Sequence, residues 1–374
     1  MIRRATINLN DANTNKIANL KLVIEEYSCL VNSYIGILWE KKMFKGTYIT
    51  PDIQREVPTW LSARLQQCAG KQAFQIVKSQ RKNKIKTKPL FEKRTVELDE
   101  RFCKIDFDPK TRIFDIWLNL TSLGSKLKII LPSHKHYHFN LFKDWIVKKA
   151  IRIRQEGEVL FADIFFTKEV PLKTEGRDIG IDCGYKKIAV TSSGQFLGTE
   201  LPAYISKITK KFRASKGFQR ALKTKNEYIN KEVKKLKLDN VKNVVVEDLK
   251  DVKKYTKKNK TMSSKFMNKL QYWNYKYFLG KLENICEVVG VQLHKINPAY
   301  TSQRCVVCGN THRSNRNGEM FECTSCGYTS DADQNASLNI LNRFTAGEYG
   351  PCAQKLKFVG GCGYIQGVYI CPYK

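Results

Sequence analysis

The chain has 374 residues, with 66 Lys and Arg against 35 Asp and Glu and a formal net charge of +31. This length allows two or three domains with cores of their own, and cations spread over the whole chain favour a long groove for a polyanion, usually nucleic acid. The absence of a long apolar run, a signal-peptide core and a lipidation motif argues against a membrane and predicts a cytoplasmic, nucleoid-associated location.

The N-terminal half combines short strands with helices. Residues 2–10 alternate apolar and polar side chains, which is typical of a strand. One face of a long helix is predicted by apolar residues at four-three spacing, which are Leu20, Ile24, Tyr27, Val31, Tyr34 and Leu38. A second helix is expected from Pro58 onward, and residues 91–171 return to alternating strands. The helical segment is therefore inserted into a β unit whose first strand pairs with strands from 91–171.

A second unit is expected from residue 172. Residues 178–184 and 187–191 read as strands, and 203–238 as a lysine-rich helical stretch with Ile205, Ile208 and Phe212 on its apolar face. The apolar run 244–247 is typical of a strand buried on both faces. Another strand is expected at 289–296 and a last helix at 334–343. This order predicts an α/β layer fold of ribonuclease-H type.

Three acidic residues are candidates for a metal-dependent active site. Asp182 shares its strand face with Gly180 and Gly184, which predicts open space for a metal ion and a phosphate. Glu247 ends a buried strand at the edge where open α/β sheets bind ligands. Asp333 lies at the start of the last helix.

Each acid also has a structural alternative. Asp182 can initiate a turn, Glu247 can be solvated at a strand end, and the pair Ser330 and Asp333 fits a capping box. Asp331 is a second candidate for the position of Asp333. As a set, three carboxylates at one sheet edge are suited to hold Mg²⁺ or Mn²⁺ for phosphodiester hydrolysis.

Four cysteines form the strongest motif. Two pairs in x2 spacing, separated by a short loop, predict a closed tetrahedral zinc site of structural type, made of Cys305, Cys308, Cys323 and Cys326. His312 lies between the pairs and reads as a loop residue.

Two further patterns are less specific. His134, His136 and His138 would share one face of a strand, either as metal ligands or as a solvated or RNA-facing edge. Phosphate contacts are predicted for the cations of the lysine-rich stretch, which include Lys207, Lys210, Lys211, Arg213, Arg220 and Lys223.

Four blocks in chain order resemble the TnpB proteins of insertion sequences, transposon-encoded relatives of type V CRISPR effectors. They are the segments 178–184, 244–249, 298–309 and 333–340. The resemblance is specific over 172–343 and looser over 1–171. It implies an RNA-guided DNA endonuclease in which Asp182, Glu247 and Asp333 match the RuvC triad.

The resemblance also implies a domain organisation. Residues 1–12 and 90–171 would form a wedge-like β-barrel, 13–89 an inserted helical recognition domain, and 172–343 a RuvC nuclease domain that contains a zinc ribbon at 300–330. Residues 344–374 read as a flexible tail. The stretch between Asp182 and Glu247 is short for the family.

The implied cofactors are structural Zn²⁺, catalytic Mg²⁺ or Mn²⁺, and a guide RNA from the transposon end. The implied substrate is double-stranded DNA beside a short flanking motif. The sequence leaves the oligomeric state open, and a monomer is expected. The alternative is a guided DNA-binding repressor or accessory factor that does not cut. An unguided ribonuclease H or resolvase is disfavoured by the large N-terminal half.

Overall fold

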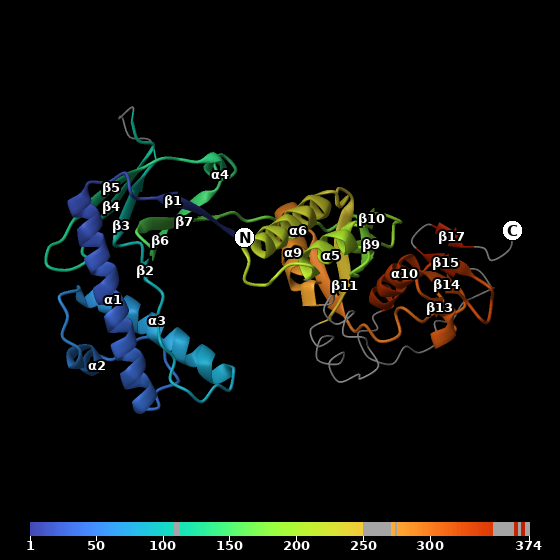
Figure 1. Cartoon of the computed structure of the whole chain (residues 1–374), viewed down its shortest axis with the longest axis horizontal. Coiled ribbons are helices and arrows are strands. Elements are labelled where there is room, and N and C mark those ends of the chain that lie inside the picture. Colours follow the sequence, from blue (N-terminus) through green and yellow to red (C-terminus); the bar gives the residue numbers. More distant parts are fainter. Residues whose placement is uncertain (108–112, 250–270, 274, 347–362, 366–367, 371–374) are drawn as a thin grey trace. The chain divides into compact units, whose positions relative to one another are not determined.

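The structure is a computed structural model, which describes residues 1–107, 113–249, 271–273, 275–346, 363–365 and 368–370 (Figure 1). The chain divides into two compact units, Met1–Glu169 and Val170–Lys374. Each unit has its own hydrophobic core. Among the described residues, no helix combines the length and the apolar character that crossing a bilayer requires.

The first unit is built on a four-stranded antiparallel sheet with the order β1-β7-β6-β2. Its strands are β1 (Ile2–Asn8), β2 (Thr95–Leu98), β6 (Ile146–Glu156) and β7 (Val159–Thr167). The first strand pairs with β7, with Ala5 opposite Ile164. Ala5 and Ile7 are buried, so the alternation puts one face of β1 in the core. The predicted pairing of the first strand with 91–171 is confirmed.

A second antiparallel sheet of this unit has the order β3-β4-β5, followed by a short helix α4 (Tyr137–Asn140). Its strands are β3 (Cys103–Asp106), β4 (Ile116–Leu120) and β5 (Ile129–Ser133). The prediction that His134, His136 and His138 share a strand face is wrong, because β5 ends at Ser133 and α4 begins at Tyr137. The Nε2 atom of His136 lies 2.8 Å from the carbonyl oxygen of Thr6.

Three helices complete the first unit, namely α1 (Thr14–Glu40), α2 (Pro51–Glu56) and α3 (Ala63–Lys82). The long first helix was predicted from its apolar spacing. The short α2 was missed, although Thr50 caps it and Pro51 opens it. Helix α3 begins later than predicted, because Leu61 still pairs with Gly124 in an extended bridge and Ser62 supplies the cap.

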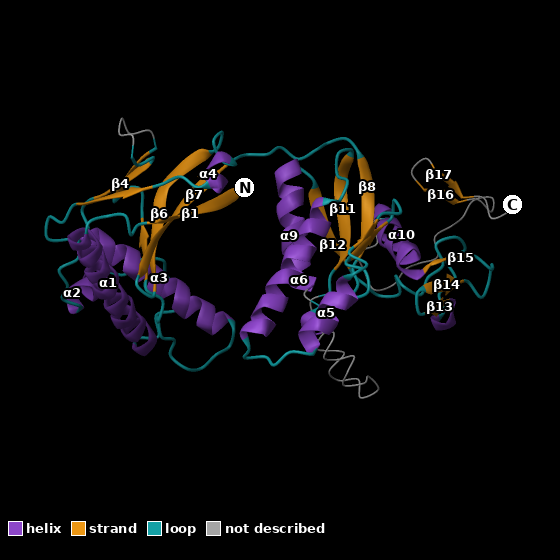
Figure 2. Cartoon of the chain, turned by 45° about the horizontal axis from the view of Figure 1, so that its top comes forward, coloured by secondary structure: helices purple, strands orange, loops and turns teal. Residues whose placement is uncertain are grey.

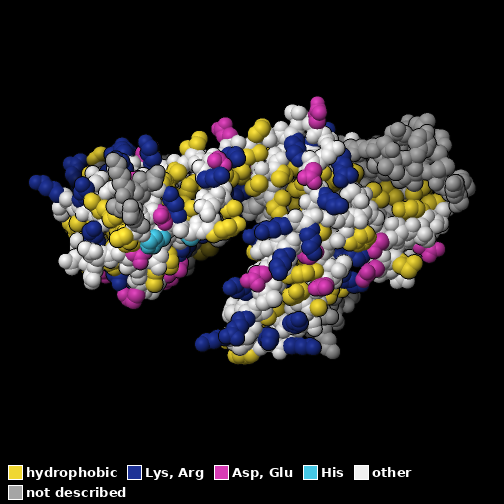
Figure 3. All heavy atoms as spheres, turned by 90° about the horizontal axis from the view of Figure 1, so that it is seen from above, with side chains coloured by type: hydrophobic (Ala, Val, Ile, Leu, Met, Phe, Trp, Pro, Cys, Tyr) yellow, Lys and Arg dark blue, Asp and Glu magenta, His cyan; other side chains and the backbone are white. Residues whose placement is uncertain are grey.

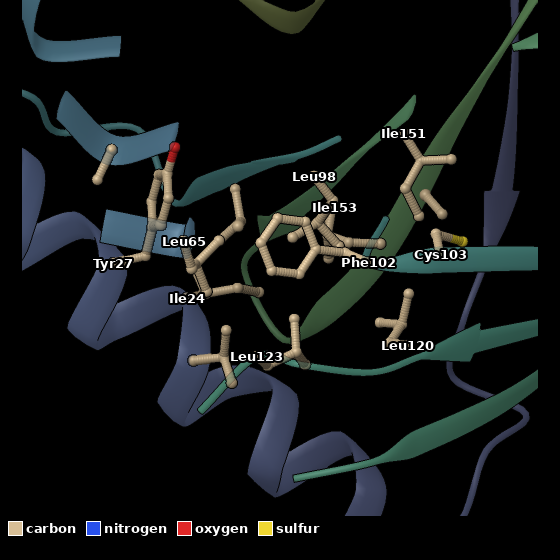
Figure 4. Close-up of a cluster of buried hydrophobic side chains, with 14 of the residues drawn as sticks. Ile24, Tyr27, Leu65, Leu98, Phe102, Cys103, Leu120, Leu123, Ile151 and Ile153 are labelled. Atoms are coloured by element: carbon tan, nitrogen blue, oxygen red, sulfur yellow. The ribbon is translucent and has the colours of Figure 1, made fainter. Parts of the chain in front are cut away.

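The core of this unit lies between the helices and the sheets. Figure 4 shows Ile24 and Tyr27 of α1 and Leu65 of α3 on one side, with Phe102 and Ile153 beside them. All five side chains are at most 1% exposed. Fully burying an apolar side chain of this size contributes roughly 1.5–3 kcal/mol, so helix packing against strand residues stabilises this unit.

The second unit contains a five-stranded sheet with the order β10-β9-β8-β11-β12. Its strands are β8 (Arg177–Asp182), β9 (Ala189–Thr191), β10 (Phe196–Leu197), β11 (Val241–Glu247) and β12 (Gln292–Ile296). Strands β8, β11 and β12 are parallel, whereas β9 and β10 are antiparallel. Val244, Val245 and Val246 are fully buried, which confirms the predicted strand with both faces covered.

Helices cover both faces of this sheet (Figure 2). They are α5 (Leu201–Thr209), α6 (Lys216–Lys234), α9 (Tyr275–Val289) and α10 (Ala332–Thr345). The first three pack on the face of Val244. Helix α10 packs on the opposite face, where Ile340 meets Val245. Strand β12 begins after the predicted residue 289, because α9 runs to Val289 and Gly290 turns the chain at a φ of 70°.

The lysine-rich stretch 203–238 is not one helix. It is broken between Thr209 and Lys216, where Ser215 caps α6 by accepting a hydrogen bond from the Phe218 amide. The break rotates Phe212 out of the apolar face, so its predicted burial is wrong. Its side chain is 78% exposed.

A small three-stranded sheet with the order β13-β14-β15 carries the cysteine motif. It comprises β13 (Arg316–Asn317), β14 (Met320–Glu322) and β15 (Thr329–Asp331), preceded by the 3₁₀ turn η1 (Arg313–Asn315). Residues 250–270 and most of the tail expected at 344–374 lie outside the described residues. Within that tail, β16 (Gly363–Ile365) pairs with β17 (Val368–Ile370).

Candidate active site and metal centre

Two of the three candidate acids end neighbouring parallel strands. Strand β8 ends at Asp182 and β11 ends at Glu247, and Ile181 lies opposite Val246 in the register. Both carboxylates therefore lie at the carboxyl edge of the sheet, where ligands bind in open α/β folds. Each is half-buried.

Helix α10 brings the third acid to the same edge. A Cβ atom on Gly180 would lie 2.2 Å from the carbonyl oxygen of Ser337, so the helix backbone occupies the space where a side chain would stand. The expectation that Gly180 leaves open space beside Asp182 is therefore wrong. The glycine instead allows α10 to approach β8 closely, which places the first turn of α10 near the strand end.

The first turn of α10 separates the roles of its two aspartates. Asp331 is the N-cap, and its Oδ1 accepts hydrogen bonds from the amides of Asp333 (3.0 Å) and Gln334 (3.1 Å). Ser330 is therefore not the cap, and the capping-box alternative for Asp333 is wrong. Because Asp331 satisfies the amides, the carboxylate of Asp333 is available for other contacts.

The three carboxylates interact electrostatically. Burial, together with the charges of Glu247 and Asp333, raises the pKa of Asp182 well above its usual range, and Arg316 only partly opposes the shift. Burial raises the pKa of Glu247 to about 7, although a hydrogen bond from Thr301 and the charges of Arg343 and Arg316 act in the opposite direction. Glu247 and Asp333 are thus near enough to Asp182 for their charges to affect it, although the three carboxylates are not as tightly clustered as the cysteine sulfur atoms described below.

Two cations contact Asp333. Arg316 Nη2 lies 2.7 Å from Asp333 Oδ1, and Lys187 Nζ lies 3.3 Å from Asp333 Oδ2. Lys187 also contacts Asp331 Oδ2 at 2.6 Å. These cations were not predicted from the sequence. Arg316 stands between the two cysteine pairs, so the cysteine module itself supplies a charge to the carboxylates.

The four cysteines form a compact cluster. The sulfur atoms of Cys305, Cys308, Cys323 and Cys326 all lie within 4.8 Å of one another. Within the described parts of the chain, no other group of three or more acidic, cysteine or histidine side chains is gathered as tightly. Soft thiolates in this number and arrangement fit a tetrahedral zinc ion.

Glycine shapes both cysteine turns. Gly309 and Gly327 directly follow the second cysteine of each pair, with φ values of 76° and 71°. Their amides donate back to the carbonyl oxygens of Cys305 and Cys323. Such left-handed positions favour glycine, and the closed turns point both cysteines of a pair to one place.

Three buried asparagines attach this module to α10 and hold its loops together. Asn335 donates to the Arg304 carbonyl and accepts from the Val306 amide. Asn339 donates to the carbonyls of Thr301 and Arg304. Asn315 bonds to both cysteine loops, through the Gln303 and Asn310 carbonyls and Thr324. The sequence could have indicated this contact. Asn335 and Asn339 share a helix with apolar residues, and a buried asparagine requires hydrogen-bond partners.

The predicted phosphate-binding cations lie mainly on α5, α6 and the turn between them. Lys207, Lys210, Lys211 and Arg220 line a groove of about 490 Å³, together with Tyr204 and residues of α6. Lys223 is exposed but does not line it, and Arg213 donates to Gln271. On the face drawn in Figure 3, Lys and Arg side chains are spread over both units.

A family model matches the C-terminal part of the chain, and several known proteins are similar to it. Residues 275–340 match the family model described as Cas12f1-like, TNB domain. The CRISPR-associated endodeoxyribonuclease Cas12f1 of Sulfoacidibacillus thermotolerans is 46% identical over 72 residues, which is 19% of this chain and 17% of that protein. The putative RNA-guided DNA endonuclease InsQ of Escherichia coli is 47% identical over 53 residues, covering 14% of this chain and 13% of InsQ.

A shorter relative is matched over most of its length. The putative transposase MJ0856.1 of Methanocaldococcus jannaschii is 36% identical over 78 residues, which is 19% of this chain and 72% of that protein. Among solved structures, the mini-RNA-guided endonuclease CRISPR-Cas_phi3 is similar with a TM-score of 0.57 and 10% identity, covering 91% of this chain and 92% of that one. At this identity the likeness concerns the fold alone.

Fold and site define a mixed α/β protein that carries a cluster of four cysteines, suited to hold a metal ion, beside a group of carboxylates. The match to the family model, over residues 275–340, includes the four cysteines and Asp333. The chain belongs to the family of TnpB-like transposon proteins and Cas12f effectors. The resemblance to TnpB proteins that the four sequence blocks indicated is confirmed.

Proposed function

We propose that this chain is an RNA-guided DNA endonuclease of an insertion-sequence transposon. In this proposal it hydrolyses phosphodiesters by a two-metal mechanism of RuvC type, with Asp182, Glu247 and Asp333 as the metal-binding residues. The names of the relatives, which include an endodeoxyribonuclease and a putative RNA-guided DNA endonuclease, support this class of activity.

One observation carries the proposal. Three acids from distant parts of the chain lie near one sheet edge, and the charges of Glu247 and Asp333 contribute to the raised pKa of Asp182. Asp333 has cationic partners in Arg316 and Lys187, but burial leaves the pKa values of Asp182 and Glu247 raised, so their ionised forms are only partly stabilised. A divalent cation would supply the missing compensation.

The donor set fits Mg²⁺ or Mn²⁺, since all three side chains offer oxygen ligands to hard cations. When bound, such ions lower the pKa of a water nucleophile and stabilise charge on the leaving oxygen. The chain's own contribution is orientation. Thr301 donates to Glu247 Oε1, which fixes that carboxylate. Arg316 and Lys187 hold Asp333 in place.

The cysteine cluster is proposed to hold Zn²⁺ as a structural ion. Its four thiolates leave no open position for a reacting water. Buried Asn335 and Asn339 connect this module to the same helix that carries Asp333. A bound zinc ion would stabilise this module, which corresponds to the expected zinc ribbon at 300–330, and through these asparagines it would help to position Asp333.

The remaining parts are assigned to nucleic-acid binding. Residues 172–343 are assigned to the nuclease domain, and the five-stranded mixed sheet with helices on both faces supports this assignment. Residues 1–12 with 90–171 are assigned to the wedge, and 13–89 to the helical recognition domain. Guide RNA and target DNA are the proposed partners. The exposed cations of α5 and α6 supply phosphate contacts.

The test is a cleavage assay with the full chain purified together with its RNA. Sequencing the co-purified RNA identifies the guide, and a matching double-stranded DNA serves as substrate with Mg²⁺. Asp182→Asn is expected to lower cleavage by at least about a thousandfold while RNA binding remains, because it removes a metal ligand.

Asp178→Asn is the matched control, because Asp178 lies on the same strand and accepts a hydrogen bond from Asn243 at 2.8 Å. It should cut at nearly the wild-type rate. Cleavage that survives Asp182→Asn would remove the triad assignment. A wild-type chain that binds guide and target without cutting would favour the repressor alternative.

A further inference from the structure

The turn between α5 and α6, residues 210–215, exposes an aromatic ring at a fixed position. Phe212 is 78% exposed, more than any other large apolar side chain in the described part of the chain. Its carbonyl oxygen accepts two hydrogen bonds from Ser215, one from the amide (3.0 Å) and one from Oγ (2.7 Å). The backbone that carries the ring is therefore held by its own contacts and by the cap of α6.

Uncompensated positive charge surrounds this ring. Lys211 and Arg213 are its chain neighbours, and the groove beside the turn is lined by Lys207, Lys210, Lys211 and Arg220. Within the described residues, none of these four lining cations forms an ion pair with an acid. One of the four, Lys207, places its Nζ atom 5.6 Å from the centre of the Tyr204 ring. The groove therefore attracts a polyanion.

The exposed ring of Phe212 and the cationic groove together indicate which kind of ligand fits this surface. A duplex offers phosphates but keeps its base faces stacked inside, whereas an unpaired strand offers phosphates and exposed aromatic faces together. Proteins bind such strands by combining a cationic groove with aromatic side chains on which bases stack. The α5–α6 turn has both parts within one short segment.

We propose that Phe212 stacks on a base of single-stranded DNA whose phosphates follow the groove between α5 and α6. This inference rests on the proposed function for the choice of DNA, because pairing of a guide with one DNA strand leaves the opposite strand unpaired. Phe212 gives the contact without sequence preference, since every base has an aromatic face.

Fluorescence anisotropy of the full chain with labelled oligothymidine tests this contact. Phe212→Ala and Phe212→Leu should each weaken binding roughly tenfold, whereas Phe212→Trp should retain it. Val288→Ala is the control, because Val288 is 49% exposed in the same unit and should leave affinity unchanged. Equal affinity of wild type and Phe212→Ala would overturn the proposal.

The salt dependence separates stacking from charge. Phe212→Ala should leave the slope of log affinity against log salt unchanged, whereas Lys210→Gln should make it shallower by about one phosphate contact. A base analogue such as 2-aminopurine in the oligomer should lose fluorescence on binding wild type and lose less with Phe212→Leu. A changed slope in Phe212→Ala, or equal quenching in both proteins, would contradict stacking.

Two further probes identify the ligand. Oligouridine that binds much more tightly than oligothymidine, with the same loss in Phe212→Ala, would overturn the assignment to DNA. Anionic phospholipid vesicles that bind through Phe212, when oligothymidine does not, would overturn the assignment to nucleic acid. These binding assays need no cleavage, so a chain that fails to cut can still bind through Phe212, and a chain that cuts can fail this test.

Discussion

The cysteine module brings four thiols together, and the carboxylate site brings three acidic side chains near one another. The two sites differ in how the negative charge of these groups is balanced. The four sulfurs lie within 4.8 Å of one another at two glycine-closed turns, and the motif that builds them spans only residues 305–327. The three carboxylates come from two strand ends and a helix start. They are accompanied by Arg316 and Lys187.

The difference separates a closed site from an open one. A closed set of four thiolates can do no more than bind its ion and hold the fold. The carboxylates keep part of their charge uncompensated, as the raised pKa values of Asp182 and Glu247 indicate. Arg316 links the two sites, since it belongs to the cysteine module and contacts Asp333.

The largest effect is expected from a substitution that breaks the closed cysteine site. Cys305→Ser removes one of four ligands, and zinc binding in such modules is worth about 10–16 kcal/mol. Zinc content by atomic absorption should fall from one ion to nearly none, and thermal unfolding should shift to lower temperature. Cys29→Ser, at an exposed thiol outside the module, is the control. A Cys305→Ser protein with full zinc content would show that the module is not a four-thiolate site.

The pH dependence of stability tests the open site. The pKa of Glu247 is raised from 4.5 to about 7, so the folded chain retains a proton there that the unfolded chain has released. Without divalent ions, stability should therefore fall as the pH rises from 4.5 to 7, by on the order of 2–3 kcal/mol. Urea unfolding across this range measures it.

Glu247→Gln carries no titrating group and should lose that part of the slope. If the variant keeps the wild-type slope between these pH values, the carboxyl of Glu247 is not held in the environment described.

A smaller effect tests the link between the sites. Arg316→Gln removes a cation from Asp333 and should lower the free energy of unfolding by about 1–3 kcal/mol, since a half-buried acid loses its partner. It should also raise the pKa values of Asp182 and Glu247 further, because Arg316 lowers both. Lys186→Gln breaks a more exposed pair with Glu319 and should cost less than about 1 kcal/mol. Equal losses in both variants would contradict a special role for Arg316.

The sequence predicted features that depend on local spacing. The long helix α1, the buried strand β11 and the cysteine cluster follow from periodicity and from paired cysteines. The sequence also pointed to three acids, but their convergence depends on the register of β8 with β11 and on the close approach of α10 to Gly180.

The errors share a cause, since each concerns a local break or a contact distant in sequence. Helix α5 ends at Thr209 and so exposes Phe212, although the sequence fits one continuous helix over 203–238. Asp331 caps α10 and leaves the carboxylate of Asp333 available, although the sequence also fits a capping box of Ser330 and Asp333. Arg316 was missed because its partner lies across the small sheet and not at helical spacing.

The most direct test of the central claim is a count of bound divalent ions. Mn²⁺ titration followed by electron paramagnetic resonance, with a short single-stranded DNA present, should give about two ions per wild-type chain. Asp182→Asn, Glu247→Gln and Asp333→Asn should each lose at least one of them, and Asp178→Asn should lose none. Wild-type Mn²⁺ binding in all three variants would show that these carboxylates do not form a metal site.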